Sequence, residues 1–419
     1  MISSVRGTKD ILPEEMPIWY FIEKTLQEVS SLFGFKEIRL PIFEKTEVFQ
    51  RSIGEATDVV RKEMYTFVDR GGDSITLRPE LTASVVRAVI QHNLLSESPL
   101  LRLWYYGPLF RYERPQKGRL RQFHQYGAEI IGSSHPEADV EILLLANSII
   151  KKLGISEYTL LINSLGNLKS RLKYREILVS YLKQHSNELS VESRERLGKN
   201  PLRVLDSKDP NDLEIIQNSP LIYDFLDEES KEHYNNTKMM LKEYGISFKE
   251  YPYLVRGLDY YSHTVFEFQS SFLGSQDAFG GGGRYNELFT QFSQKNDIPS
   301  IGFALGIERI VLILESQGIE FKQENPKVFV AYNDSKFIPK VLEIAQKLRE
   351  FGISTIFDLQ RRSLKAQLKD ANKKGVSYTI IIGEEEINNQ TISIKNMQDG
   401  NQFTIEIRKG IEFLINELK

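Results

Sequence analysis

A short basic segment is the first place in this sequence where residue types and spacing suggest chemistry. It carries five basic residues and one acid: Arg111, Arg114, Lys117, Arg119, Arg121 and Glu113. A basic loop of this kind is most often a solvated turn. Because the segment follows an apolar strand, however, Arg111 and Glu113 are expected to alternate onto one face. A guanidinium beside a carboxylate on such a face suits a phosphate group together with the amino group of a base.

The returning strand continues the same alternation. Phe123, Gln125, Gly127 and Glu129 are spaced two residues apart and should therefore share the face predicted for Arg111 and Glu113. The pattern thus predicts an aromatic ring, an amide and an acid close to the basic loop.

Two further arginines need an explanation. Arg309 lies in the apolar segment GIERIVLILE, where a buried guanidinium requires a partner, either an internal acid or a ligand phosphate. Arg256 stands beside Gly257 and Asp259 in RGLDYYSHTVFEF and precedes the aromatic pair Tyr260 and Tyr261. Tyrosines in strands are more often core residues than site residues, whereas Arg256 is harder to explain as part of a core.

The run Gly280 to Gly283 in AFGGGGRY is open to two interpretations. It is either a flexible turn or a flat floor that a substrate can approach closely, because glycine has no side chain. The run is neither a GxGxxG fingerprint nor a Walker loop. If ATP binds here, it binds without a P-loop.

The composition limits the possible chemistry. The 419 residues are 41% hydrophobic and 26% charged, with a net charge of -3, which is ordinary for a soluble protein. The absence of cysteine excludes thiol nucleophiles and cysteine zinc sites and fits a reducing cytoplasm. The six histidines show no paired zinc spacing, and no apolar run reaches the ~18 residues of a membrane helix. Any nucleic-acid contact must come from local basic patches.

The elements that must position these residues follow from hydrophobic periodicity. In the first part we expect a helix over 18–35 and a strand over 36–44 that carries Pro41. Next come a strand and a helix over 74–92, with Glu80 and Thr82 in the first helical turn. A strand pair over 100–132, a helix over 136–154 and strands at 158–167, 251–270 and 301–306 complete this part. The strands cluster, which favours an antiparallel sheet.

The remaining segments define the predicted domains. Residues 168–245 are polar and helical in pattern and are interpreted as an inserted module. KQENP, at 322–326, is a predicted linker. Beyond it, strands alternate with helices, which indicates a small α/β domain with a mostly parallel sheet. The sequence therefore predicts an α+β domain over 1–322 and an α/β domain with a mixed sheet over 326–419.

Together these segments resemble the class II aminoacyl-tRNA synthetases, and within them the histidyl-tRNA synthetases. GFKEIRLPIFE resembles motif 1, FRYERPQKGRLRQFHQYGAEIIG motif 2 and IGFALGIERI motif 3, in the order and spacing of that class. TLRPELT, RGLDYYSHTVFEF and GGGGRY resemble the histidine-specific segments. The resemblance covers essentially the whole chain, from RGTKDILP to SLKAQLKDANKKG. One departure follows GGGGRY, where Asn286 and Glu287 replace the expected Asp and Gly.

The resemblance implies an ATP site. Arg111 would bind the α-phosphate and Glu113 the adenine amino group. Phe123 and Arg309 would sandwich the adenine ring, with Arg309 also near the γ-phosphate, and Arg121 would help to bind the triphosphate. Mg²⁺ is expected to accompany ATP and to neutralise the pyrophosphate.

It also implies a histidine site next to the ATP site. Glu80, Thr82 and Gln125 would bind the α-amino group, while Glu129 and Tyr261 would take the two imidazole nitrogens. Arg256 would lie between the carboxylate and the α-phosphate. The remaining implied residues are Tyr260 and Tyr285 beside the imidazole, and Gln116 facing the acceptor end of the tRNA.

The expected activity is therefore histidine–tRNA ligation in the cytoplasm, by a homodimer without membrane contact, with histidine, ATP and tRNA(His) as substrates. The segment RRSLKAQLKDANKK, at 361–374, carries six basic residues and one acid and would bring the last domain to the anticodon. Two alternatives are a synthetase-like regulatory subunit of histidine biosynthesis, which does not aminoacylate, and a class II synthetase for another amino acid such as threonine or proline. RGLDYY and Glu129 argue against the second.

Overall fold

The protein consists of two compact units. The structure, a computed structural model, describes residues 2–54, 57, 59–258, 260–274, 277–292 and 296–418, so that Asp259 lies outside the described residues. The first unit extends to Phe321 and the second begins at Lys322. The segment predicted as a linker, 322–326, lies at this division.

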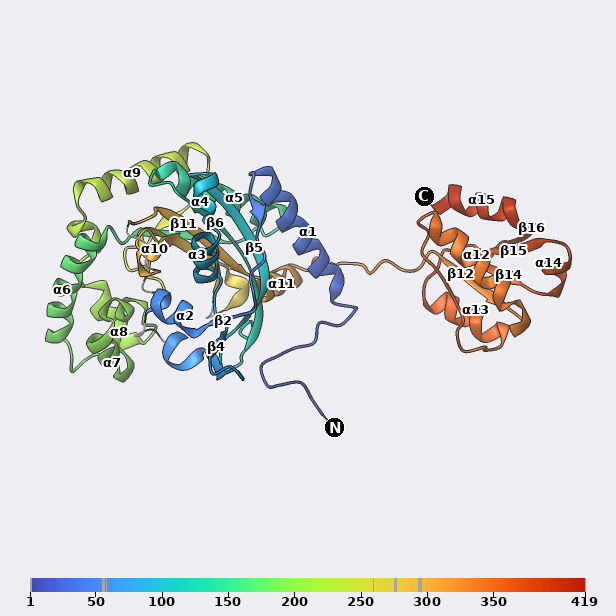
Figure 1. Cartoon of the computed structure of the whole chain (residues 1–419), viewed down its shortest axis with the longest axis horizontal. Helices are drawn as coiled ribbons and strands as arrows, with labels where there is room; N and C mark the ends of the chain where they lie inside the picture. The colour runs from blue at the N-terminus through green and yellow to red at the C-terminus, as the bar shows by residue number, and fades with distance from the viewer. Residues whose placement is uncertain are drawn as a thin grey trace. The chain divides into compact units, whose positions relative to one another are not determined.

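An eight-stranded sheet forms the centre of the first unit (Figure 1). Its strands, from edge to edge, are β1 (Lys36–Glu37), β5 (Leu101–Phe110), β6 (Gln122–Ile131), β11 (Ser300–Gly306), β10 (Ala278–Arg284), β9 (Ser262–Gln269), β7 (Thr159–Ser164) and β8 (Lys249–Glu250). The pairs from β5 to β7 are antiparallel, and only the short edge strands β1 and β8 run parallel to their neighbours. The predicted antiparallel sheet is confirmed.

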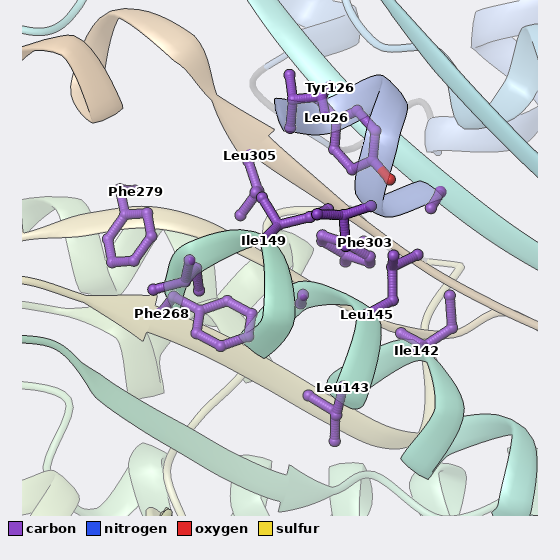
Figure 2. Packing of buried hydrophobic residues seen from close by; sticks show 14 of the residues in the cluster. Leu26, Tyr126, Ile142, Leu143, Leu145, Ile149, Phe268, Phe279, Phe303 and Leu305 are labelled. Carbon is purple, nitrogen blue, oxygen red and sulfur yellow. The ribbon is translucent and has the colours of Figure 1, made fainter. Parts of the chain in front are cut away.

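One face of this sheet is covered by helices. They are α1 (Met16–Leu32), α5 (Pro136–Lys152), α9 (Glu228–Glu243) and α11 (Ile307–Ser316). Alternate strand residues such as Trp104, Tyr126 and Phe303 point into this layer and pack against apolar residues of α1 and α5. Figure 2 shows this core, with Leu145 and Ile149 of α5 beside Phe303 and Leu305 of β11.

The opposite face carries the intervening strand residues. Leu103 and Tyr105 pack there against Val85 and Val89 of α3 (Thr82–Gln91). A small sheet of β2 (Phe43–Lys45), β4 (Ser74–Leu77) and β3 (Tyr65–Val68) belongs to the same unit. The shorter elements are α2 (Thr46–Ile53), η1 (Val59–Glu63), α4 (Leu94–Glu97), η4 (Ser271–Leu273) and α10 (Leu288–Gln291).

The segment predicted as an inserted module is helical. It contains α6 (Leu168–Gln184), α7 (Val191–Lys199), η2 (Pro201–Asp206), α8 (Pro210–Gln217), η3 (Ile222–Phe225) and α9. Most of these helices share a core of their own, around Tyr174, Leu178 and Val204. Helix α9 differs, because Tyr234 and Leu241 join the main core beside α5. The module is therefore anchored on the sheet through α9.

The second unit has the predicted mixed sheet, in the order β13-β12-β14-β15-β16. Its elements are β12 (Val328–Tyr332), η5 (Ser335–Phe337), α12 (Ile338–Glu350), β13 (Thr355–Phe357), α13 (Leu364–Lys373), β14 (Tyr378–Ile382), α14 (Glu384–Asn388), β15 (Thr391–Asn396), β16 (Gln402–Glu406) and α15 (Ile407–Leu418). The pairs β12/β13 and β12/β14 are parallel, whereas β14, β15 and β16 are antiparallel. The short helix α14 was not predicted.

Two local predictions near the first strands are wrong. Residues 36–44 do not form one strand, because β1 ends at Glu37 and β2 begins at Phe43. Arg78 donates 2.8 and 3.1 Å hydrogen bonds to the carbonyls of Leu40 and Pro41, which therefore need no strand partner. Glu80 lies before α3 and not within its first turn. Its carboxylate accepts from the main-chain N–H groups of Thr82 (2.6 Å) and Ala83 (2.8 Å), as a capping group does.

Two strand predictions extend too far. Strand β5 ends at Phe110, so Arg111 and Glu113 do not share a strand face. The N–H of Arg111 pairs with the carbonyl of Arg121, and a turn follows in which the N–H of Glu113 donates to the carbonyl of Arg111. Tyr260 and Tyr261 precede β9, which begins at Ser262. By contrast, AFGGGGRY is not a turn, because Ala278 to Arg284 forms β10 inside the sheet.

A wholly buried ion pair joins the layers. The guanidinium of Arg284, at the end of β10, donates to Asp139 of α5 over 2.8 Å and to the carbonyls of Ser133 and His135. His233 of α9 lies 3.2 Å from the other oxygen of Asp139. Burial alone would raise the pKa of Asp139, but Arg284 and His233 lower it to about 2. The pair thus fixes the sheet, α5 and the insertion to one another.

We predict that Asp139→Asn destabilises the chain by about 3–5 kcal/mol, because Arg284 would lose its buried counter-charge. Urea-induced unfolding followed by circular dichroism measures this loss. The control Arg51→Ala removes an exposed helical pair with Glu47 and should cost no more than about 0.5 kcal/mol. Equal effects of the two substitutions would refute a structural role for the buried pair.

Candidate active site

A cavity of about 300 Å³ opens on the face of the sheet opposite the main core. All but two of the predicted site residues line it: Glu80, Thr82, Arg111, Glu113, Phe123, Gln125, Glu129, Arg256, Tyr260, Tyr261, Tyr285 and Arg309. They come from the start of α3 and the loop before it, the β5–β6 hairpin, the loop before β9, the residue after β10 and the start of α11. The alternation predicted along β6 is therefore present, since Phe123, Gln125 and Glu129 all face the cavity.

Glu129 lies at the buried end of this cavity. Its carboxylate accepts hydrogen bonds from Thr82 Oγ1 at 3.0 Å, Tyr105 OH at 2.8 Å and Tyr285 OH at 2.8 Å. Gly302 faces Glu129 across the ladder, and a Cβ there would stand 1.5 Å from a carboxylate oxygen. Only glycine therefore lets the Glu129 side chain lie against β11. Sequence reasoning missed Tyr105, although it alternates with Leu103 and faces Gly127.

A second buried acid, Glu80, lies near Glu129. Burial raises the pKa of each carboxyl group to about 7, although the hydrogen bonds that each accepts lower it. The charge of Glu80 further raises the pKa of Glu129. This end of the cavity therefore favours a positively charged or hydrogen-donating ligand, such as an amine or an imidazole N–H.

Arg256 faces the glycine strand. Its guanidinium forms a 2.6 Å ion pair with Glu267 of β9, and the side chain is only 20% exposed. A Cβ at Gly281 would stand 2.8 Å from Nη1 of Arg256, so the glycine run makes room for this guanidinium. The predicted floor thus accommodates one of the protein's own side chains. Sequence reasoning also missed Glu267, whose signal was an acid within the apolar strand VFEF.

The other end of the cavity is cationic. Arg111 donates from Nε to the carbonyl of Pro79 at 2.9 Å, and its guanidinium lies 5.4 Å from the ring centre of Phe123. Glu113 lies 3.9 Å from Arg111 and 3.3 Å from Arg119. Arg309 donates to the carbonyls of Gly118, at 3.2 Å, and Ala278. The sequence predicted an internal acid or a ligand phosphate as its partner, whereas these hydrogen bonds go to main-chain carbonyl oxygens. Arg309 also lines the cavity. Guanidinium groups fixed in this way suit phosphate oxygens.

Two predicted site residues are not among those that line the cavity. The guanidinium of Arg121 lies 3.9 Å from the ring centre of Tyr112 and donates to the carbonyl of Glu113 at 3.2 Å. Gln116 is exposed in the hairpin loop, where its main chain pairs with that of Arg119. The structure therefore does not bring the side chains of these two residues into the cavity with the other predicted site residues.

Two absences hold for the described residues only. Within 2–54, 57, 59–258, 260–274, 277–292 and 296–418, no group of three or more His, Asp or Glu side chains is arranged to bind a metal ion. No helix in these ranges is both long and apolar enough to cross a membrane.

A largely antiparallel sheet with a cavity that is acidic at one end and cationic at the other is the architecture of a class II aminoacyl-tRNA synthetase, and the match to a solved structure of that class agrees with it. The family model for histidyl-tRNA synthetase matches residues 7–310, and that for the anticodon binding domain matches residues 327–417. The chain belongs to the histidyl-tRNA synthetase family.

Relatives and a solved structure agree with this assignment. The chain is 47% identical to the histidine–tRNA ligase of Listeria innocua over 415 residues, which is 98% of this chain and 97% of that protein. It is 44% identical to the histidine–tRNA ligase of Fervidobacterium nodosum over 100% of both chains. The crystal structure of apo histidyl-tRNA synthetase from S. aureus matches with a TM-score of 0.83 and 39% identity, over 99% of this chain and 100% of that one.

We predict that Glu129→Gln makes the stability of the ligand-free protein less dependent on pH. Folding raises the pKa of Glu129 from 4.5 to about 7, so the folded state binds this proton more tightly than the unfolded state. The resulting gain in the free energy of unfolding is present at low pH and is lost as pH rises through about 7. In the unmodified chain the unfolding temperature should therefore fall between about pH 5 and pH 8, and in the variant it should fall less. Calorimetry without ligands measures both profiles.

The exposed Glu176 of α6 offers a control for this measurement. Glu176→Gln should leave the pH profile of the unmodified chain intact. Parallel profiles for Glu129→Gln and the unmodified chain would contradict a raised pKa at Glu129.

Proposed function

We propose that this cavity carries out both reactions of a histidine–tRNA ligase. Histidine and ATP give histidyl-adenylate and pyrophosphate, and histidine then passes to the 3′ end of tRNA(His). One observation carries this proposal. The buried acid Glu129, with its three hydroxyl donors, lies in the same cavity as three arginines, Arg111, Arg256 and Arg309. An amino acid with a basic side chain and a triphosphate can therefore meet there.

Histidine would bind at the acidic end. Glu129 and Tyr261 would take the two imidazole nitrogens, with Tyr260 and Tyr285 beside the ring. The residues for the α-amino group would be Glu80, Thr82 and Gln125. A side chain without these two nitrogens would leave buried polar groups unpaired, and sites of this kind discriminate by about 10⁴–10⁵-fold.

ATP would bind at the cationic end. Arg111 would contact the α-phosphate, and Glu113 the adenine amino group. Phe123 and Arg309 would lie on the two faces of the adenine ring, with Arg309 also near the γ-phosphate. Arg121 would turn from the ring of Tyr112 towards the triphosphate, because an anion offers its guanidinium a stronger partner than an aromatic face.

The first reaction joins two anions. A carboxylate oxygen of histidine forms a bond to the α-phosphorus, and the bond from that phosphorus to the pyrophosphate oxygen breaks. Arg256 would lie between the carboxylate and the α-phosphate, and Arg111 on the α-phosphate, so that both stabilise the charge that develops. The ion pair with Glu267 holds Arg256 in place before the substrates arrive.

The second reaction needs no protein nucleophile. The terminal ribose hydroxyl of the tRNA attacks the acyl carbon, and AMP leaves. This agrees with a chain that contains no cysteine.

Mg²⁺ would enter with ATP and neutralise the departing pyrophosphate. Glu267 and Glu308 both line the cavity and offer carboxylate oxygens, which are the ligands that Mg²⁺ prefers. Either residue would hold the ion directly or through its water ligands.

The tRNA and a second subunit would complete the enzyme. The second unit, which contains the basic helix α13, would bind the anticodon, and Gln116 would face the acceptor end. Pro41 would lie at a dimer interface, because its neighbours Ile42 and Phe43 are apolar and 44% and 59% exposed. We place the activity in the cytoplasm, because this chain contains no cysteine and cytoplasmic proteins do not rely on disulfides.

The regulatory-subunit alternative is less supported. A non-aminoacylating relative has no need of an anticodon-binding part, yet the anticodon model matches residues 327–417 of this chain. The two relatives reported above, at 47% and 44% identity, are both histidine–tRNA ligases.

We predict that only histidine supports exchange of pyrophosphate with ATP, and that Arg256→Ala lowers this exchange by about 10²–10³-fold while ATP binding remains measurable. The reason is that Arg256 acts where charge develops. The exposed Arg194 of α7 provides the control, since Arg194→Ala should retain full exchange. Loss of ATP binding in Arg256→Ala, or exchange with another amino acid, would refute the assigned role.

We also predict that removal of residues 326–419 weakens tRNA charging far more than adenylate formation, because the two compact units divide near this point. Charging assays and pyrophosphate exchange on the same preparation compare the two. An equal loss of both would argue against an anticodon role for the second unit.

A further inference from the structure

One side chain of the insertion hydrogen-bonds to the main chain of the histidine pocket. Arg171, in the first turn of α6, donates a hydrogen bond to the main-chain carbonyl of Tyr261. Tyr261 belongs to the loop that also carries Arg256 and Tyr260, and all three line the cavity. A charged donor from the insertion thus acts directly on the backbone of the pocket.

The start of α6 is itself fixed. Asn167 caps the helix by accepting from the N–H of Ser170 at 2.9 Å, and its amide donates to Asp227, the N-cap of α9. The main chain of His263 exchanges hydrogen bonds of 2.8 and 2.7 Å with Gly166 and Leu165. Arg171 therefore projects from a firmly placed helix end onto Tyr261.

Tyr261 and Tyr285 are two walls of the proposed imidazole site. Tyr285 donates to Glu129, and the ring of Tyr260 lies 4.7 Å from the ring of Tyr261 and 5.9 Å from that of Tyr285. Arg171 holds the main chain of one of these walls, Tyr261. A shift of Arg171 therefore changes where the Tyr261 ring lies relative to Tyr260 and Tyr285.

We propose that Arg171 is a positioning residue for histidine, which couples the helical insertion to the position of Tyr261 in the imidazole site. This inference rests on the proposed function, because it assigns the effect of Arg171 to the histidine pocket. It makes the placement of α6 a determinant of histidine affinity. Because ATP binding should survive even the loss of Arg256 from the same loop, the KM for ATP should change less than the KM for histidine.

Pyrophosphate exchange with Arg171→Ala and Arg171→Lys tests the proposal through the separate KM values for histidine and ATP. Loss of a charged hydrogen bond should raise the KM for histidine about 10-fold or more in Arg171→Ala, with the KM for ATP within about 2-fold. Arg171→Lys should recover part of the loss.

Arg175→Ala provides the matched control, since Arg175 lies exposed one turn further along α6. It should change neither KM. The proposal is overturned if Arg171→Ala changes both KM values equally or neither. Should Arg171→Ala fail to fold, Arg171→Lys decides by the same criterion. Absence of histidine-dependent exchange in the unmodified chain would instead refute the proposed function.

Discussion

The structure depends on one constraint: a single cavity contains buried charges of both signs. The acids at one end must be kept from pairing with the arginines at the other end. Within the described residues, Glu129 is satisfied by hydroxyl groups and Glu80 by main-chain N–H groups. Neither set of hydrogen bonds gives the carboxyl group a positively charged partner. Arg256 differs, because its guanidinium pairs with the carboxylate of Glu267 outside the acidic end. The cavity therefore retains a strong electrostatic gradient, which is costly to bury and useful only when a ligand supplies the missing charges.

The sheet provides the geometry that makes this gradient possible. Strand alternation sends Trp104 and Tyr126 to the helical core and sends Tyr105 and Glu129 to the cavity, so that one ladder builds both. Glycine at Gly302 and Gly281 lets a carboxylate and a guanidinium lie flat against the backbone. Substrate groups can then approach charges fixed by main-chain geometry, with little reorganisation during the reaction.

Much of this arrangement was predictable from sequence because it follows from periodicity. The alternation of Phe123, Gln125 and Glu129 predicted that their side chains share one face of the sheet, and the apolar spacing of 136–154 predicted helix α5. The errors have one physical origin, since tertiary contacts replaced local preferences. Arg78 satisfies the carbonyls of Leu40 and Pro41, so the strand around them breaks. Glu267 and Tyr105 were overlooked because single residues in apolar strands give no signal until their partners, Arg256 and Glu129, are placed in space.

A crystal structure with histidine and a non-hydrolysable ATP analogue bound together would test the central claim most directly. We predict that the imidazole lies on Glu129 and that the guanidinium of Arg256 touches both the amino acid carboxylate and the α-phosphate while still paired with Glu267. An imidazole bound away from Glu129, or an Arg256 that contacts Glu267 alone while the phosphates bind elsewhere, would contradict it.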